Sequence, residues 1–180
     1  SDPNYMLSDD DGDTWRYGGR MFSFQGRPYV RYTSDNKSRI HFITTEEHPR
    51  HFNNGIYHGY VENGKVFASD GRLVGPLSSS EKTDLSPTDF TAVFRGSGEV
   101  RKDVAWTNDI ALDEHGYPYI GFSVTKDPIK LGETKDTQEG GFDHRYHYAR
   151  WDGARWHDYE IAYAGTRLYA GENEYTGLIA

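Results

Sequence analysis

Ser8-Asp-Asp-Asp-Gly-Asp-Thr-Trp15, near the start of the 180-residue chain, is the most specific local pattern in the sequence. It follows the order Ser-x-Asp-x-Gly-x-Thr-Trp at every defined position, and these residue types suit a tight turn. Asp10 can accept hydrogen bonds from turn N–H groups, Gly12 can adopt a positive φ, and Trp15 can pack beneath the strands that the turn joins. We therefore predict a β-hairpin here and a structural role for the motif.

Further along, short segments recur at a nearly constant spacing. The matches, 89 or 90 residues apart and in the same order, are Gly26-Arg-Pro-Tyr-Val30 with Gly116-Tyr-Pro-Tyr-Ile120, Tyr57-His58 with Tyr146-His147, and Asn63-Gly64 with Asp152-Gly153. Self-similarity at one spacing is the signature of a repeat architecture. The chain is therefore predicted to contain two copies of one structural unit.

Each copy contains runs in which apolar and polar residues alternate, which is the pattern of a half-buried strand. The clearest runs are Arg39–Thr44, Gly55–Val61, Tyr119–Val124 and Arg145–Ala149. Asn-Gly and Asp-Gly between such runs predict hairpins at 62–66 and 151–156, in addition to the one at 8–15. Each unit then has about four short antiparallel strands, which is one blade of a β-propeller.

The predicted fold is therefore all-β, a β-propeller fragment. Its parts are the end of one blade in 1–20, a blade in 21–100, a blade in 101–163 and the start of the next blade in 164–180. A ring needs several more blades to close, so both ends of the chain are expected to be cut points within a larger protein. Residues 68–104 and 125–143 are predicted to be long polar connections, the second containing a surface insertion.

The composition excludes several classes of function. The 14 Tyr, 9 Phe, 4 Trp and 20 Gly residues favour strands and turns over helices. A net charge of −8 without a cluster of Lys and Arg argues against a nucleic-acid partner. The absence of Cys excludes disulfides, thiolate metal sites and a Cys nucleophile. No apolar run is long enough to span a bilayer, so we expect no membrane partner.

Polar and aromatic residues gather in the connections that a propeller places on the face opposite these hairpins. Arg and His suit a carboxylate or sulfate, and Tyr and Trp suit the faces of sugar rings. The predicted substrate-binding residues are His48, Arg50, Asn54, Trp106, Asn108 and Tyr175. For any single His or Tyr among them, the alternative is a half-buried side chain that only packs against the sheet.

Two longer segments resemble the BNR-4 repeat proteins. They are Arg39-Ile-His-Phe-Ile-Thr-Thr-Glu-Glu-His-Pro-Arg50 with Asn54-Gly-Ile-Tyr-His58, and Arg145-Tyr-His-Tyr-Ala-Arg-Trp-Asp-Gly153 with Tyr163-Ala-Gly-Thr-Arg167. The turn at Ser8–Trp15 matches the Asp box of such repeats. This group includes ulvan lyases with seven-bladed propellers, so the resemblance implies about three of seven blades. It also implies β-elimination at a uronic acid of an anionic, ulvan-like polysaccharide, by a secreted or periplasmic protein.

The resemblance further implies roles for individual residues. In propeller lyases a Tyr and His residues transfer protons, and an Arg holds the carboxylate. Carried over by motif, His58 and Tyr146 are the acid/base residues, His41 supports them and Arg167 neutralises the carboxylate. Tyr148, two residues beyond Tyr146, is an alternative to it. The expected partners are the polysaccharide and the rest of the propeller ring.

Two other functions and one cofactor question stay open. A sialidase-like glycoside hydrolase would use a Tyr nucleophile beside a Glu, an acid Asp and three Arg residues. A carbohydrate-binding propeller would bind oligosaccharides without turnover. We expect no cofactor; a structural metal ion is the alternative, although no His-x-His or His-Glu-x-x-His spacing supports one. The isolated 180 residues are expected to be inactive, because a propeller's channel site draws on blades all round the ring.

Overall fold

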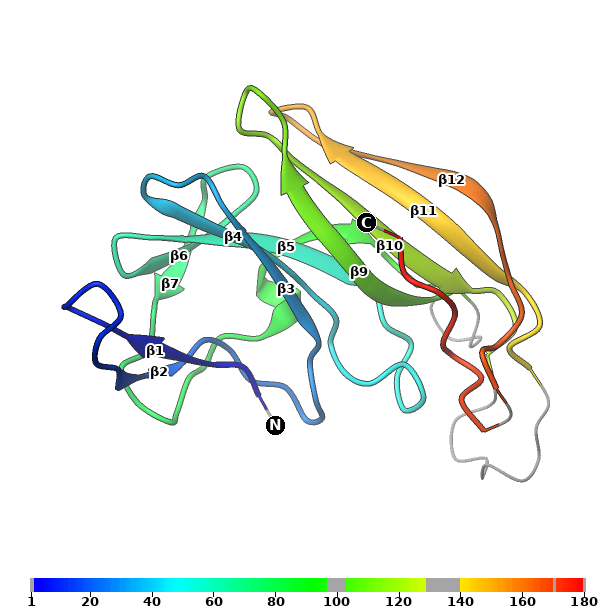
Figure 1. Cartoon of the computed structure of the whole chain (residues 1–180), viewed down its shortest axis with the longest axis horizontal. Helices are drawn as coiled ribbons and strands as arrows, with labels where there is room; N and C mark the ends of the chain where they lie inside the picture. Colours follow the sequence, from blue (N-terminus) through cyan, green and yellow to red (C-terminus); the bar gives the residue numbers. More distant parts are fainter. Residues whose placement is uncertain (1, 97–102, 129–139, 170, 180) are drawn as a thin grey trace.

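The structure, a computed structural model, describes residues 2–96, 103–128, 140–169 and 171–179 (Figure 1). Within these ranges the regular elements are antiparallel β-strands and a short 3-10 helix at Pro87–Asp89. No helix in the described ranges has the length and apolar character that a bilayer crossing needs. The all-β prediction is confirmed.

The described strands form a hairpin and two larger sheets (Figure 1). The hairpin consists of β1 (Asn4–Leu7) and β2 (Arg16–Arg20). The first sheet contains β3 (Val30–Ser34), β4 (Arg39–Thr44), β5 (Ile56–Glu62), β6 (Lys65–Ala68), β7 (Leu73–Pro76) and β8 (Thr91–Phe94). The second sheet contains β9 (Val104–Leu112), β10 (Pro118–Thr125), β11 (His144–Trp151) and β12 (Trp156–Gly165).

The turn between β1 and β2 has the geometry that its sequence predicts, except at the tryptophan. The N–H of Thr14 donates to Oδ1 of Asp10 at 2.9 Å, and Gly12 has a φ of 97°. The indole of Trp15 donates to the carbonyl of Gly12 at 2.9 Å, but the residue is 61% exposed. The expectation that it packs beneath the hairpin is wrong. The ring instead lies against Gly12, because the indole N–H bonds to the Gly12 carbonyl of the turn.

Both later hairpins form where Asn-Gly and Asp-Gly predict them. Asn63 and Gly64 have φ values of 50° and 69° between β5 and β6. Between β11 and β12, Asp152 N–H donates to the Arg155 carbonyl at 3.1 Å, and Gly153 has a φ of 96°. The two turns therefore occupy the same place in their sheets, after the third strand.

One of the sequence matches does not correspond to a structural equivalence. Gly26–Val30 leads into β3, the first strand of its sheet, whereas Gly116–Ile120 leads into β10, the second strand. Because the structural repeat pairs β5 with β11, only the two matches at a spacing of 89 residues join equivalent positions.

The outer strand of the first sheet is interrupted. In the second sheet the single strand β12 pairs with β11 from Trp156 to Gly165, with two register shifts, whereas β6 and β8 divide the same edge of β5 between them. The excursion between β6 and β8 contains β7 and the 3-10 helix, and the Arg20 N–H of β2 donates to its Ser80 carbonyl at 3.0 Å. The prediction that 68–104 is one long polar connection is therefore wrong at β7 and β8. The predicted insertion within 125–143 falls largely outside the described residues.

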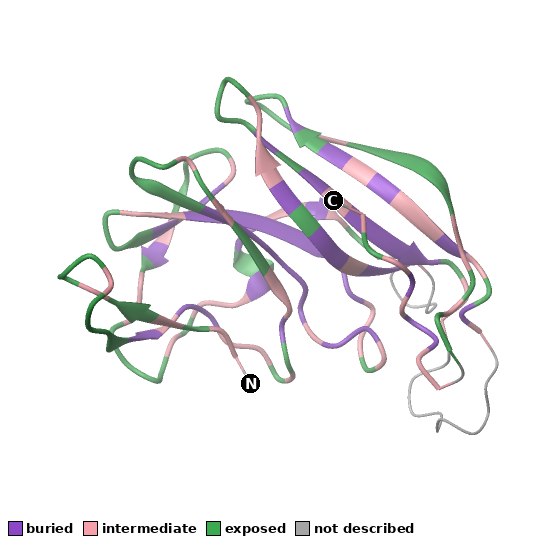
Figure 2. Cartoon of the chain, viewed as in Figure 1, coloured by how far each residue is buried: buried purple, intermediate pink, exposed green. Residues whose placement is uncertain are grey.

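Both faces of the first sheet are buried along most of β5 and the second part of β4, which Figure 2 draws in purple. One face packs against the second sheet in a core of Ile43, Ile56, Val93, Ala105, Ile110, Ile120, Phe122, Val124 and Ala149. The other packs against Met21, Phe22 and Phe90 through Phe42, Tyr57 and Val66. The outer strand β12 stays mostly exposed (Figure 2).

This arrangement sets the position of the polar connections. The β5–β6 and β11–β12 hairpins lie at one end of their sheets, and the β4–β5 and β10–β11 connections lie at the other end. Residues 21–29 lead into β3 at that second end, and the segment after β12 starts there. The connections with the polar and aromatic residues therefore share one rim.

Candidate functional site

The β4–β5 connection is held by its own buried polar side chains. Glu46 accepts from the Tyr57 hydroxyl at 2.7 Å and from the Gly55 N–H at 2.8 Å. Burial raises the pKa of Glu46, and the hydrogen bond from Tyr57 acts against this rise. The Asn54 side chain accepts from the Glu47 N–H at 3.0 Å and is fully buried. Asn54 thus braces the loop and, being fully buried, is not accessible from the rim.

At the tip of this connection, His48 bonds to Tyr175 of the C-terminal segment. Its Nδ1 accepts from the Arg50 N–H at 3.1 Å, and its Nε2 lies 2.5 Å from the Tyr175 hydroxyl oxygen. Because Nδ1 is an acceptor, the neutral ring carries its proton on Nε2 and donates it to Tyr175. The tyrosine hydroxyl then keeps its own proton to donate elsewhere.

Burial sets the charge state of this pair. It lowers the pKa of His48 to about 4, with a further decrease from the nearby Arg50. It also raises the pKa of Tyr175 well above its usual range. Both side chains are therefore neutral near pH 7, and Tyr175 is a proton donor rather than a phenolate.

Aromatic rings from both sheets surround the pair. The Trp106 ring, on β9, lies 5.1 Å from that of Tyr175 and 5.8 Å from that of His48, between ring centroids. The Tyr29 ring, just before β3, lies 4.2 Å from that of Trp106 and 5.7 Å from that of His48. The rim therefore has an aromatic cluster: Tyr29, His48, Trp106 and Tyr175.

Arg50 is engaged with the same C-terminal segment. It donates to the Gly171 carbonyl at 3.0 Å and pairs with Glu172, and its Nε lies 3.9 Å from a carboxylate oxygen of Glu174. The guanidinium is therefore neutralised by protein carboxylates. Of the six predicted substrate-binding residues, the structure brings His48, Arg50, Trp106 and Tyr175 together.

The predicted catalytic residues His41 and His58 form a separate, internal pair between the two sheets. His41 Nδ1 lies 3.2 Å from His58 Nε2, and His58 Nδ1 lies 2.8 Å from the Ser69 hydroxyl. The indole of Trp156, on β12, donates to the same hydroxyl at 2.9 Å. His58 is 1% exposed, and burial lowers its pKa well below the usual value. The chain of hydrogen bonds thus connects the first sheet to the second.

Comparison with known proteins adds the family. The model of the BNR repeat-containing family matches residues 1–164. The chain belongs to this family. Among solved structures, the BNR-repeat chain is similar to an ulvan lyase of the polysaccharide lyase family PL25, with a TM-score of 0.63 and 17% sequence identity. The match covers 88% of this chain and 37% of the other, so the similarity shows a partial propeller fold. No curated protein sequence matches the chain.

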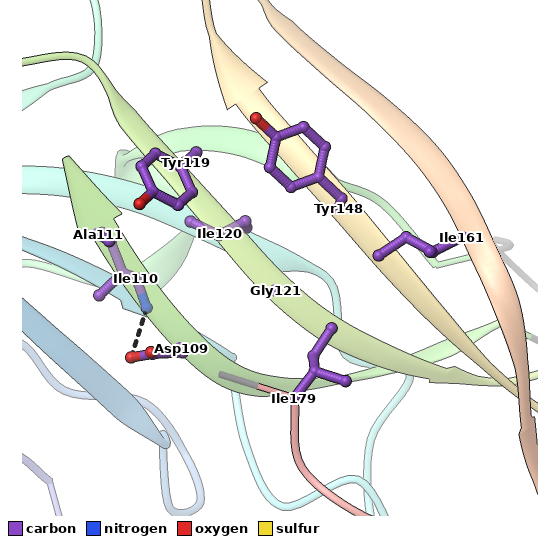
Figure 3. A pocket seen from close by; sticks show the side chains of 9 residues that line it. All are labelled: Asp109, Ile110, Ala111, Tyr119, Ile120, Gly121, Tyr148, Ile161 and Ile179. Carbon is purple, nitrogen blue, oxygen red and sulfur yellow. Dashed lines mark hydrogen bonds between the residues drawn. The ribbon is translucent and has the colours of Figure 1, made fainter. Parts of the chain in front are cut away.

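The remaining predicted residues of the BNR-repeat chain lie elsewhere. The Tyr146 hydroxyl donates to the Gly177 carbonyl at 3.0 Å, and Arg167 donates to the Asn173 side chain at 3.0 Å. Asn108 is buried at an irregularity of β9, and its side-chain atoms have no hydrogen-bond partner among the described residues. Tyr148, the alternative to Tyr146, lines an apolar pocket on the outer face of the second sheet with Tyr119, Ile161 and Ile179 (Figure 3).

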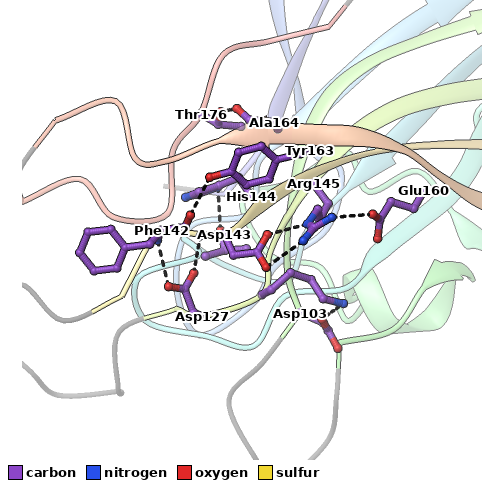
Figure 4. A network of polar contacts seen from close by, with 12 residues as sticks. Asp103, Asp127, Phe142, Asp143, His144, Arg145, Glu160, Tyr163, Ala164 and Thr176 are labelled. Atoms are coloured by element: carbon purple, nitrogen blue, oxygen red, sulfur yellow. Dashed lines mark hydrogen bonds and ion pairs between the residues drawn. The ribbon is translucent and has the colours of Figure 1, made fainter.

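The β10–β11 connection carries a network of charges at the same rim (Figure 4). Arg145 donates to Asp143 at 2.5 and 3.0 Å and to Glu160 at 3.0 Å. Asp127 accepts from the backbone N–H groups of Phe142 and Asp143, both at 2.9 Å. These charges are satisfied within the protein and hold the connection in place. In the described residues no group of three or more His, Asp or Glu side chains is arranged to hold a metal ion.

Sequence reasoning missed two residues of the rim, Arg27 and Tyr29. They lie in the Gly26–Val30 segment, which was used only as a repeat marker. A usable signal was present: an Arg and a Tyr directly before the first strand of a blade occupy an inter-blade connection, where propellers place ligand contacts.

Proposed function

We propose that the chain is part of a polysaccharide lyase that cleaves an anionic, uronic-acid-containing polysaccharide of the ulvan type by β-elimination. The observation that carries the proposal is the His48–Tyr175 hydrogen bond of 2.5 Å inside the aromatic cluster. The family and the likeness to an ulvan lyase support it. Because such polymers are too large to enter a cell, we also propose a secreted or periplasmic location.

We propose that Tyr175 donates a proton to the sugar. β-Elimination moves the C5 proton of the uronate to a base, forms the C4–C5 double bond as the C4–O bond breaks, and gives a proton to the leaving glycosidic oxygen. We assign Tyr175 only the last of these transfers; the base that takes the C5 proton is a separate group. The Tyr175 oxygen accepts a hydrogen bond from the Nε2–H of His48, and this bond would stabilise the phenolate that forms after the transfer. His48 is then a positioning residue. His41 and His58 are buried between the sheets, and we assign them a structural role.

The hydrolase alternative would need a reactive tyrosine beside a glutamate. Tyr57 and Glu46 have these residue types and are hydrogen bonded, but both are buried, 6% and 5% exposed. Burial raises the pKa of Tyr57 well above its usual range, which opposes its action as a nucleophile. The pair therefore favours a loop brace over a hydrolase centre.

The test uses the product of the complete reading frame that encodes this chain, mixed with ulvan and with other uronic-acid polysaccharides. A lyase product has a conjugated double bond, so ultraviolet absorbance should rise. Tyr175→Phe keeps the ring and removes the hydroxyl, and we expect it to lower kcat by about 10²-fold or more. Tyr169→Phe, in the same segment and 62% exposed at its tyrosine, is the matched control.

The outcomes separate the possible functions. A flat trace with every polymer, together with new reducing ends, would indicate hydrolysis. A flat trace with measurable binding would indicate a carbohydrate-binding propeller. Full activity of Tyr175→Phe would reject the role given to Tyr175.

A further inference from the structure

Tyr29 and Trp106 form an aromatic corner between the two sheets. Their ring planes are inclined by 51°, with centroids 4.2 Å apart, and both residues are partly exposed. The Tyr29 N–H donates to the Thr45 hydroxyl at 3.1 Å, which fixes the backbone before β3. Rigid, partly exposed rings of this kind offer an apolar surface of the size of one sugar ring.

Arg27 lies beside this corner. Its guanidinium carbon is 5.3 Å from the centroid of the Tyr29 ring, and its Nη2 donates to the Tyr29 hydroxyl at 2.5 Å. The residue is exposed, and among the described residues it has no ion pair with a carboxylate. Its positive charge also contributes to the lowered pKa of His48, so it acts on the aromatic cluster.

The other arginine beside the aromatic cluster, Arg50, is already compensated. Arg50 is paired with Glu172 and lies near Glu174. The Glu47 carboxylate packs over Gly26, and its Oε1 lies 3.5 Å from Nδ1 of His51, a contact that is an ion pair only when His51 is protonated. Arg27, beside the aromatic cluster, therefore keeps guanidinium N–H donors for an outside anion in addition to the one that it donates to Tyr29.

We propose that Arg27, Tyr29 and Trp106 form a binding subsite for an anionic sugar unit. In this subsite Arg27 holds the carboxylate or sulfate while the sugar ring lies against the aromatic corner. Arg27 thus selects charged polymers over neutral ones. The inference rests on the proposed function only in taking a polysaccharide as the ligand, and it does not require turnover.

The test is calorimetric binding of defined oligosaccharides to the product of the complete reading frame and its Arg27→Gln variant. Three ligand sets of equal length are compared: uronate oligomers, sulfated oligomers without uronate, and neutral oligomers. We expect Arg27→Gln to weaken binding of an anionic set about tenfold or more, because a charge-assisted contact is lost. Binding of the neutral set should not change. The anionic set that loses more affinity identifies the anion.

Matched variants distinguish the loss of the Arg27 charge from a change in protein structure. Arg31→Gln removes an exposed arginine four residues away and should leave all affinities unchanged. Arg27→Lys keeps the charge without the planar fork and should lie between wild type and Arg27→Gln. If Arg27→Gln does not fold, the salt dependence of Arg27→Lys gives the same answer, since the anion contact weakens as salt screens it.

Equal loss for neutral and anionic ligands would overturn the charge role, and no loss with any ligand would overturn the subsite. These results differ from failure of the proposed function. A protein that binds anionic oligomers through Arg27 but gives no ultraviolet product keeps the subsite and rejects the lyase.

Discussion

At the scale of single residues, the buried His41 of the His41–His58 pair makes the stability of the fold depend on pH. Burial lowers the pKa of His41 to about 4, and Arg39 lowers it further. The pKa of a His in the unfolded chain is about 6.5. The folded protein therefore binds fewer protons than the unfolded chain between these values. The contribution of neutral, buried His41 to the unfolding free energy is fully present above pH ~6.5 and is lost as the pH falls towards 4.

Between pH 6 and 4.5 the unfolding free energy should fall less steeply with decreasing pH in His41→Gln than in wild type. The difference in slope should reach up to ~1.4 kcal/mol per pH unit. Urea unfolding across this range measures the slope. His115→Gln is the control, because the His115 side chain is 72% exposed. A slope in His41→Gln equal to that of wild type would show that the buried imidazole does not control acid stability.

At the scale of elements, the Asp box is a hairpin built by its side chains. Both carboxylate oxygens of Asp10 accept from Thr14, at 2.9 Å from the N–H and 2.5 Å from the hydroxyl. Asp10→Ala removes both bonds, so amide hydrogen exchange at Thr14 and along β1 and β2 should accelerate. Asp9→Ala, which removes only an exposed pair with Arg16, should leave these rates nearly unchanged. Equal rates in the two variants would contradict the motif's structural role.

The same scale shows what could be predicted from the sequence. Hairpins were predictable because Asn-Gly and Asp-Gly have local conformational preferences. The division of one outer strand into β6 and β8 was not, because it depends on which distant segment pairs with β5. The site divides in the same way. His48, Arg50 and Tyr175 follow from their places in connections. Trp106 was expected in a connection but lies on β9, and the burial of Asn54 depends on contacts across the β4–β5 connection.

At the scale of the whole molecule, the described sheets share one core, and this predicts a single cooperative unit. Phe122 is fully buried on β10, and its cluster includes Ile43 and Ile56 of the first sheet. Phe122→Ala should cost about 3–5 kcal/mol of unfolding free energy. Because the cavity lies between the sheets, amides of β4 and β5 should lose as much exchange protection as those of β10 and β11.

Tyr159→Ala is the matched control, since this aromatic residue of β12 is 58% exposed and should change the unfolding free energy by about 0.5 kcal/mol or less. If Phe122→Ala lowered protection only in β9–β12, the two sheets would unfold independently. The rim would then be a junction between separately moving parts. Shared loss of protection would instead mean that the His48–Tyr175 bond, which links the β4–β5 connection to the C-terminal segment, is held by both sheets together.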